Sequence, residues 1–186
     1  MSRNEFLTGH LLISQPKNTE GHFTKSVILI AHHNYAGAWG VVVNRLAKTV
    51  KIKDIMNAAG IEYTEDGTAY IGGPVEPTRV HVVHSLDWSS SNTLKITEEI
   101  GITGDVSILA AISQNQGPKF YRAGVGLAVW TAGQLDGEQS GQSPWTPEHQ
   151  WLTTPATSEL IFNSVGEEQW QNAINASVSN RIATLF

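Results

Sequence analysis

Short segments that are apolar on both faces constrain the fold of this chain more than any other feature of its sequence. Residues 10–14, 26–31 and 39–44 are rich in Val, Ile and Leu, and Gly, Pro and Asn separate them. A surface helix would repeat its apolar residues with a 3.6-residue period, and a half-exposed strand would alternate them. Because these segments do neither, we predict central strands of a sheet that is covered on both faces.

The rest of the pattern adds strands, helices and loops. Further strands are expected over residues 68–71, 80–84, 92–97 and 121–130, and 48–53 is either a half-buried strand or the lead into a helix. Helices are expected over 54–59, 105–113, 155–163 and 167–177, the last with a capping box at 164–167. Residues 139–148, rich in Ser, Gly, Gln and Pro, predict an exposed loop. No linker or repeat divides the sequence, so we expect one domain of mixed helix and strand over residues 1–186.

The charge balance argues against a nucleic-acid partner and against an anionic membrane surface. The formal net charge is −5, and residues 96–186 carry nine acidic and three basic side chains. Nucleic acids and anionic lipids are held mainly by basic side chains. The first residues do not resemble a signal peptide, and no apolar run is long enough to cross a bilayer. We therefore expect a cytoplasmic protein.

The sequence lacks the residues that several classes of catalytic site require. The absence of cysteine excludes disulfides, thiolate nucleophiles and cysteine-bound metals. Seven histidines are present, but His81 and His84 would face opposite sides of a strand, and no HExxH motif occurs. There is also no P-loop, no dinucleotide fingerprint and no G-x-S-x-G elbow. We therefore expect neither a catalytic metal nor a cofactor.

Three segments nevertheless carry polar groups or glycines that a core does not require. In residues 31–45, His33, Asn44 and Arg45 stand at strand ends, where ligands often bind, although such residues also cap the backbone of hairpins. In residues 70–75, Gly72 and Gly73 precede a proline and form either an anion-binding nest or a purely structural turn.

The third segment, residues 124–138, runs from a strand of small residues into an acidic turn. Its polar and aromatic candidates are Trp130, Gln134, Asp136 and Glu138. The two carboxylates suit an acid and base pair or a hard cation, and they equally suit the solvated start of a helix. The sequence leaves these alternatives open.

Taken together, these motifs resemble the AlgH/YqgE family of uncharacterised bacterial proteins. The resemblance spans most of the chain and rests on Gly9–Pro16, Phe23, Ser26–Val27, His33, Gly37–Gly40, Asn44–Arg45, Gly72–Val75, Arg79, His84, Gly124–Trp130, Gly133–Asp136, Glu138 and Trp151–Leu152. It implies an α+β fold with a bent, partly barrel-like mixed β-sheet flanked by helices, in a cytosolic bacterial protein. One branch of the family is labelled a regulator of exopolysaccharide gene expression, although this acidic chain offers no basic recognition helix.

The chain departs from the family pattern at two places that bear on function. His32 stands where the family usually has Glu before His33, and residues 139–148 look like an insertion. If the Glu–His pair were catalytic in relatives, His32 would remove that role here. Within the insertion, Trp145 beside Pro144 is the best candidate for an exposed anchor in a protein contact.

Three functional hypotheses follow, and we favour the first. A binding or regulatory module would present a groove lined by Asn44, Arg45, Trp130 and Gln134 to a protein or a small ligand. A small-molecule hydrolase or transferase would use His33 or His84 as base, Arg45 or Arg79 to hold an anion, and Asp136 or Glu138 to orient the base. A third and disfavoured alternative is a DNA-binding transcriptional regulator.

Overall fold

Ten strands and five helices form the part of the chain that the computed structural model describes, which is residues 6–17, 21–142, 144 and 151–185. The strands are β1 (His10–Ser14), β2 (Val27–Asn34), β3 (Gly37–Val42), β4 (Leu46–Lys51), β5 (Thr68–Ile71), β6 (Val75–Ser85), β7 (Leu94–Lys95), β8 (Ile100–Thr103), β9 (Tyr121–Thr131) and β10 (Trp151–Pro155). The helices are α1 (Ile52–Ala58), α2 (Val106–Ser113), α3 (Gln134–Ser140), α4 (Ser158–Phe162) and α5 (Gly166–Ala183).

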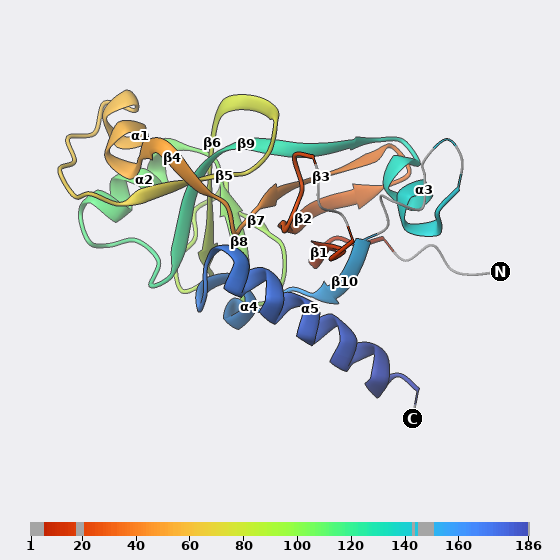
Figure 1. The fold of residues 1–186 in the computed structure, drawn as a ribbon. Helices are drawn as coiled ribbons and strands as arrows, with labels where there is room; N and C mark the ends of the chain where they lie inside the picture. Colours follow the sequence, from red (N-terminus) through yellow and green to blue (C-terminus); the bar gives the residue numbers. More distant parts are fainter. Residues whose placement is uncertain (1–5, 18–20, 143, 145–150, 186) are drawn as a thin grey trace.

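The long strand β9 joins the two halves of one sheet, whose main order is β10-β1-β2-β3-β9-β6-β8-β7. The C-terminal half of β9 pairs with β3, while its N-terminal half pairs antiparallel with β6 and parallel with β5. The sheet is therefore mixed, and it is curled into a half-barrel within a single domain (Figure 1). These features confirm the α+β class and the bent sheet that the family resemblance implies.

Glycines allow the close crossing of β9 by the turn between β5 and β6. Gly126 has φ +83°, and a Cβ atom there would overlap the carbonyl oxygen of Gly73. Conversely, a Cβ on Gly73, which has φ +154°, would overlap the carbonyl group of Leu127. Because other residues would add both strain and overlap, glycine is required at this crossing.

The helices cover different parts of the curled sheet. Figure 1 shows α1 and α2 at one end of the molecule, α3 at the opposite end, and α4 and α5 along the lower side. Trp170 and Ala173 of α5 pack into the largest apolar cluster together with residues of β1, β2 and β8. Leu135 of α3 joins a second cluster on the other face of β1, β2 and β3. The central strands are therefore buried on both sides, as predicted. No helix in the described part of the chain is long and apolar enough to cross a membrane.

The structure corrects the sequence predictions near the C-terminus. The predicted helix over 155–163 is shortened to α4 because residues 151–155 form β10, which pairs with β1 from His10↔Pro155 to Ser14↔Trp151. The predicted capping box at 164–167 is wrong, since Val165 is the N-cap of α5 and makes no side-chain cap. Strand β8 was not predicted, and the expected loop over 139–148 begins inside α3. Residues 143 and 145–150, including Trp145, lie outside the described residues.

Candidate functional site

Five of the eleven predicted site residues come together at the α3 end of the molecule. These residues, which we call the α3 cluster, are His33, Trp130, Gln134, Asp136 and Glu138. They meet because the hairpin of β2 and β3 pairs with the end of β9, which leads directly into α3. The described hydrogen bonds and ion pairs do not connect Asn44, Arg45, Arg79 or His84 to this cluster.

Glu138 is the centre of the α3 cluster and is only 6% exposed. Its Oε2 atom accepts hydrogen bonds from the indole N–H groups of Trp130, at 3.0 Å, and Trp151, at 2.9 Å. Its Oε1 atom accepts from the Gln134 amide at 2.9 Å. Buried carboxylates need hydrogen-bond partners, and here all three are neutral donors. Glu138 therefore fastens α3 to β9 and β10.

The hydrogen bonds of His33 determine where its ring proton lies. The backbone N–H of Leu7 donates to Nδ1 at 3.0 Å, so Nδ1 is an acceptor. In the neutral ring the proton is then on Nε2, which lies 3.4 Å from Oδ2 of Asp136. A general base needs an unprotonated nitrogen facing its substrate. In this arrangement His33 presents none, because its only acceptor nitrogen is bound to the backbone.

Asn44 and Arg45 lie at the opposite end of β3 and mainly hold the chain together. Asn44 accepts from the backbone N–H of Val27 at 2.8 Å and donates to the carbonyl oxygens of Lys25, at 2.8 Å, and Gly166, at 2.9 Å. Arg45 donates to the hydroxyl of Ser26 at 2.9 Å, and partial burial lowers its pKa. Asn44 thus fixes the start of α5 against β2 and β3.

The remaining predicted residues are Gly72 and Gly73 in the crossing beside β9, and Arg79 and His84 on β6. Gly72 lies in the crossing beside β9, where its N–H donates to the carbonyl oxygen of Val125 at 2.8 Å and so does not face a ligand. Arg79 is exposed and pairs with Glu76 at 2.9 Å, near the crossing that contains Gly73.

His84 is fully buried, and both of its ring nitrogens are occupied. Nδ1 donates to the carbonyl oxygen of Ser85 at 2.9 Å, so Nε2 accepts from the hydroxyl of Thr103 at 2.9 Å. Burial lowers the pKa of His84, although the backbone bond and Asp87 oppose this shift. His84 is consequently a structural residue of β6 in this arrangement.

Two surface cavities formed by described residues lie elsewhere, and none of the eleven predicted residues lines either of them. One has a volume of about 340 Å³ and lies near the start of α4. The other, which we call the α4–α5 cavity, has a volume of about 400 Å³. Its lining residues come from the two helices and their connection and are Glu159, Leu160, Asn163, Ser164, Glu168, Asn172 and Asn175.

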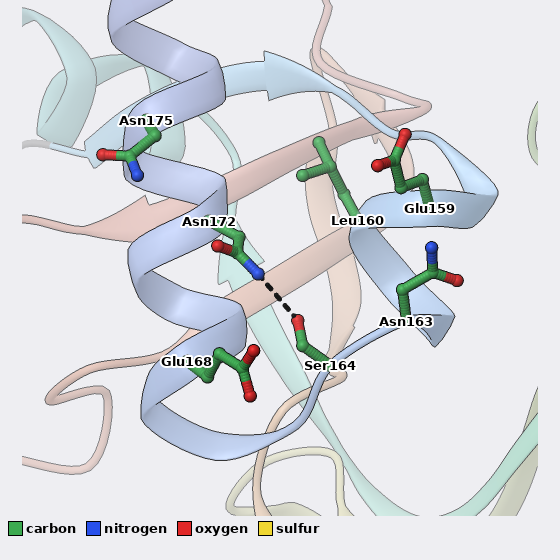
Figure 2. Close-up of a pocket in the computed structure, with 7 residues that line it drawn as sticks. All are labelled: Glu159, Leu160, Asn163, Ser164, Glu168, Asn172 and Asn175. Carbon is green, nitrogen blue, oxygen red and sulfur yellow. Dashed lines mark hydrogen bonds between the residues drawn. The ribbon is translucent and has the colours of Figure 1, made fainter.

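The α4–α5 cavity is rich in polar groups that the protein does not use. Figure 2 shows one hydrogen bond between its lining side chains, from the Asn172 amide to the Ser164 hydroxyl at 3.1 Å. Within the described part of the chain, the side chains of Glu159, Asn163 and Glu168 have neither a hydrogen bond nor an ion pair. These acceptors are available to a ligand.

A buried arginine fixes the connection that forms one side of this cavity. Arg122 of β9 is 5% exposed and donates to the carbonyl oxygens of Val43 and Ser164, the latter at 2.6 Å, and to the side chain of Gln169 at 2.6 Å. Gln169 in turn donates to the carbonyl oxygens of Leu160 and Ile161. Burial lowers the pKa of Arg122. The cavity is therefore built on a rigid support.

Sequence reasoning missed this support, although one signal for it was present. Arg122 is the only charged residue in the segment 121–130, which was expected to be a strand of small residues. A charged side chain at such a position needs several partners inside the protein. The cavity residues themselves gave no such signal, because Glu and Asn on a terminal helix resemble ordinary solvated surface.

Comparison with known proteins decides the family. A family model described as AlgH-like matches residues 11–180. The chain belongs to the AlgH-like family. A UPF0301 protein of Rhodospirillum rubrum is 34% identical to it over 172 residues, covering 91% of this chain and 86% of the relative. A UPF0301 protein of Sphingopyxis alaskensis is 31% identical over 182 residues, covering 96% and 94%.

Solved structures give the AlgH-like chain the same fold. The solution structure of AlgH from Pseudomonas aeruginosa superposes with a TM-score of 0.75 at 28% identity and covers 95% of this chain and 91% of that protein. A crystal structure of a Corynebacterium diphtheriae protein superposes with a TM-score of 0.70 at 23% identity and covers 92% and 87%. The second likeness concerns the fold alone. The names of these proteins state no ligand or reaction.

Proposed function

We propose that this AlgH-like protein is a non-catalytic binding module and that a small ligand binds in the α4–α5 cavity. The observation that carries the proposal is a cavity of about 400 Å³ in which the side chains of Glu159, Asn163 and Glu168 have no partner among the described residues. This volume is within the range of small-molecule sites. The proposal keeps the binding role expected from the sequence but moves it away from the groove between Asn44 and Gln134.

The support beneath the cavity favours a binding role. Arg122 holds the carbonyl oxygen of Ser164, and Asn44 holds that of Gly166, so both ends of the short connection between α4 and α5 are anchored to the sheet. A site that is rigid before binding loses less entropy when a ligand arrives.

The alternative of a hydrolase or transferase has less support. His33 offers no free acceptor nitrogen, and His84 is buried with both nitrogens bonded. Arg45 and Arg79 are not joined to the α3 cluster by any contact in the part of the chain that the structure describes. The acidic balance also disfavours a nucleic-acid partner. A role for the α3 cluster in binding stays a separate prediction.

Amide NMR spectra of the whole chain test the proposal. We expect a panel of chemically diverse metabolite-sized molecules to include at least one that shifts the signals of residues 159–175 in a saturable manner. The variant Asn163→Trp fills the cavity mouth and should abolish these shifts, whereas Asn57→Trp, on the exposed face of α1, should not. If no molecule gives saturable shifts there, or if both variants behave alike, the proposal is wrong.

A further inference from the structure

We propose that side chains of α3 and α5 block the outer edge of β10, so that a second copy of this chain cannot add its own β10 to the sheet. Among the described strands, β10 pairs only with β1 and is therefore the last strand on its side of the sheet. Such a strand has backbone N–H and C=O groups that no neighbouring strand uses, and these groups favour pairing with another chain. The block operates without a ligand in the α4–α5 cavity and is separate from the proposed binding role.

The hydrogen bonds of Trp151 and Thr153 show which backbone groups of β10 face away from β1. The N–H of Trp151 donates to the side-chain oxygen of Gln139 on α3 at 3.2 Å, and the carbonyl oxygen of Thr153 accepts from the hydroxyl of Ser177 on α5 at 2.9 Å. In an antiparallel pair, the N–H and C=O groups of one residue point to the same side, and that side alternates along the strand. Trp151 and Thr153 therefore turn their backbone groups outward, and we call these groups the β10 edge.

A second copy of β10 is a strand that fits the β10 edge. In an antiparallel pair, two residues that lie opposite each other can exchange both N–H···O bonds. If two copies meet with Thr153 opposite Thr153, each N–H finds the carbonyl oxygen of the other copy, and the contact has the twofold symmetry of most homodimers. The Trp, Leu and Thr residues of β10 also suit strand pairing. In the native chain, Ser177 occupies the carbonyl oxygen that this pairing requires.

The packing of α5 holds its blocking group in place. Ser177 is fully buried, and the next turn of α5, which runs beside β10 in Figure 1, adds a hydrogen bond from the Asn180 amide to the Thr154 hydroxyl at 2.7 Å. Pro155 also faces outward, because it lies two residues after Thr153, and it has no N–H to offer. Among the residues described, no side chain accepts from the Thr153 N–H. Loss of the Ser177 hydroxyl would therefore leave Thr153 with both groups that pairing needs.

Removal of both blocking side chains tests the proposal. Sedimentation equilibrium compares the wild-type chain with the double variant Gln139→Ala/Ser177→Ala over a range of protein concentrations. Because two hydrogen-bonding positions become free, we expect the self-association constant to rise about tenfold or more. The control Gln142→Ala/Ser179→Ala makes the same chemical changes at exposed positions whose side chains form no hydrogen bond with β10 in the described structure, and it should associate like the wild type.

Amide hydrogen exchange locates the new contact and separates it from a loss of stability. The Thr153 amide should exchange quickly in the wild type, and in the double variant its exchange should become slower as the protein concentration rises. The single variant Ser177→Ala frees one position and gives the same measurement if the double variant does not fold. The proposal is wrong if the folded variants associate no more than the wild type, if the control associates equally, or if association protects amides outside residues 151–155 instead.

Discussion

Replacing Glu138 by Gln removes the charge at the centre of the α3 cluster while keeping the shape of the side chain. In the native protein the carboxylate accepts three hydrogen bonds, from Trp130, Trp151 and Gln134. A glutamine has one acceptor oxygen and one amide group that donates. If the oxygen continues to face the two indoles, the new NH₂ group faces the donating NH₂ group of Gln134, and that hydrogen bond is lost.

The expected cost follows from these three bonds. A hydrogen bond to a charged group contributes about 1.5–3 kcal/mol, and a buried donor without a partner costs about 1–3 kcal/mol. Burying a neutral amide in place of a carboxylate offsets part of this loss. We therefore expect Glu138→Gln to lower the free energy of unfolding by about 2 kcal/mol. With a urea m-value of about 2 kcal/mol/M, the unfolding midpoint falls by about 1 M.

Urea unfolding followed by tryptophan fluorescence measures this shift, since Trp130 and Trp151 contact the altered group. The exposed control Glu62→Gln changes the charge equally and should shift stability by no more than about 0.5 kcal/mol. Combining Glu138→Gln with Trp151→Phe should cost less than the sum of the single changes, because the two residues share one hydrogen bond. A Glu138→Gln protein as stable as the wild type would refute the assignment of Glu138 as the fastening group of α3.

Three further predictions concern other parts of the fold. Gly126→Ala forces an unfavourable φ and brings the new Cβ atom into overlap with Gly73, so we expect the free energy of unfolding to fall by at least about 2 kcal/mol. Circular dichroism should then show a melting temperature lowered by about 4 °C or more. An unchanged melting temperature would contradict the close packing described for this crossing. Arg122→Met leaves the carbonyl oxygen of Ser164 without its donor. We expect the free energy of unfolding to fall by about 3 kcal/mol and the amide NMR signals around Ser164 to shift. Signals that do not move would contradict the role of Arg122 as a support of the α4–α5 connection. Burial lowers the pKa of His81 to about 4, so on acidification the unfolded chain binds a proton before the folded chain does. The free energy of unfolding should therefore be highest above pH 6.5 and fall by about 3 kcal/mol as the pH drops from 6.5 to 4. A His81→Gln variant whose stability depends on pH in the same way would contradict this.

Much of the sheet was predictable because burial on both faces leaves a plain pattern. The segment that forms β1 was predicted from its run of apolar residues, and its observed bounds agree with that prediction. Strand β8 was missed because its four residues, Ile100 to Thr103, include a glycine and are too short to show a period. Strand β10 was missed because it ends in Pro155, which resembles a helix start in the sequence.

The candidate site was less predictable for a different physical reason. The sequence showed that polar groups stand at strand ends, but not that the Asn44 side chain makes its three hydrogen bonds with backbone groups. It also predicted the last helix, but not that α4 folds back beside Glu168 to enclose a cavity. The contacts of Asn44 and the formation of the cavity both depend on the packing of segments that are distant in the sequence. The local sequence pattern does not indicate which distant segments pack together.

The shared strand β9 has a consequence for the newly synthesised chain. Strands β3, β5 and β6 all form hydrogen bonds with it, yet β3 ends at Val42 and β9 begins only at Tyr121. At about 5–20 residues per second, the ribosome needs roughly 4–16 s to bridge that interval. During this time the edge of β3 has no neighbour on that side and is open to pairing with other chains. Aggregation of the nascent protein should therefore be most acute just before residues 121–131 emerge.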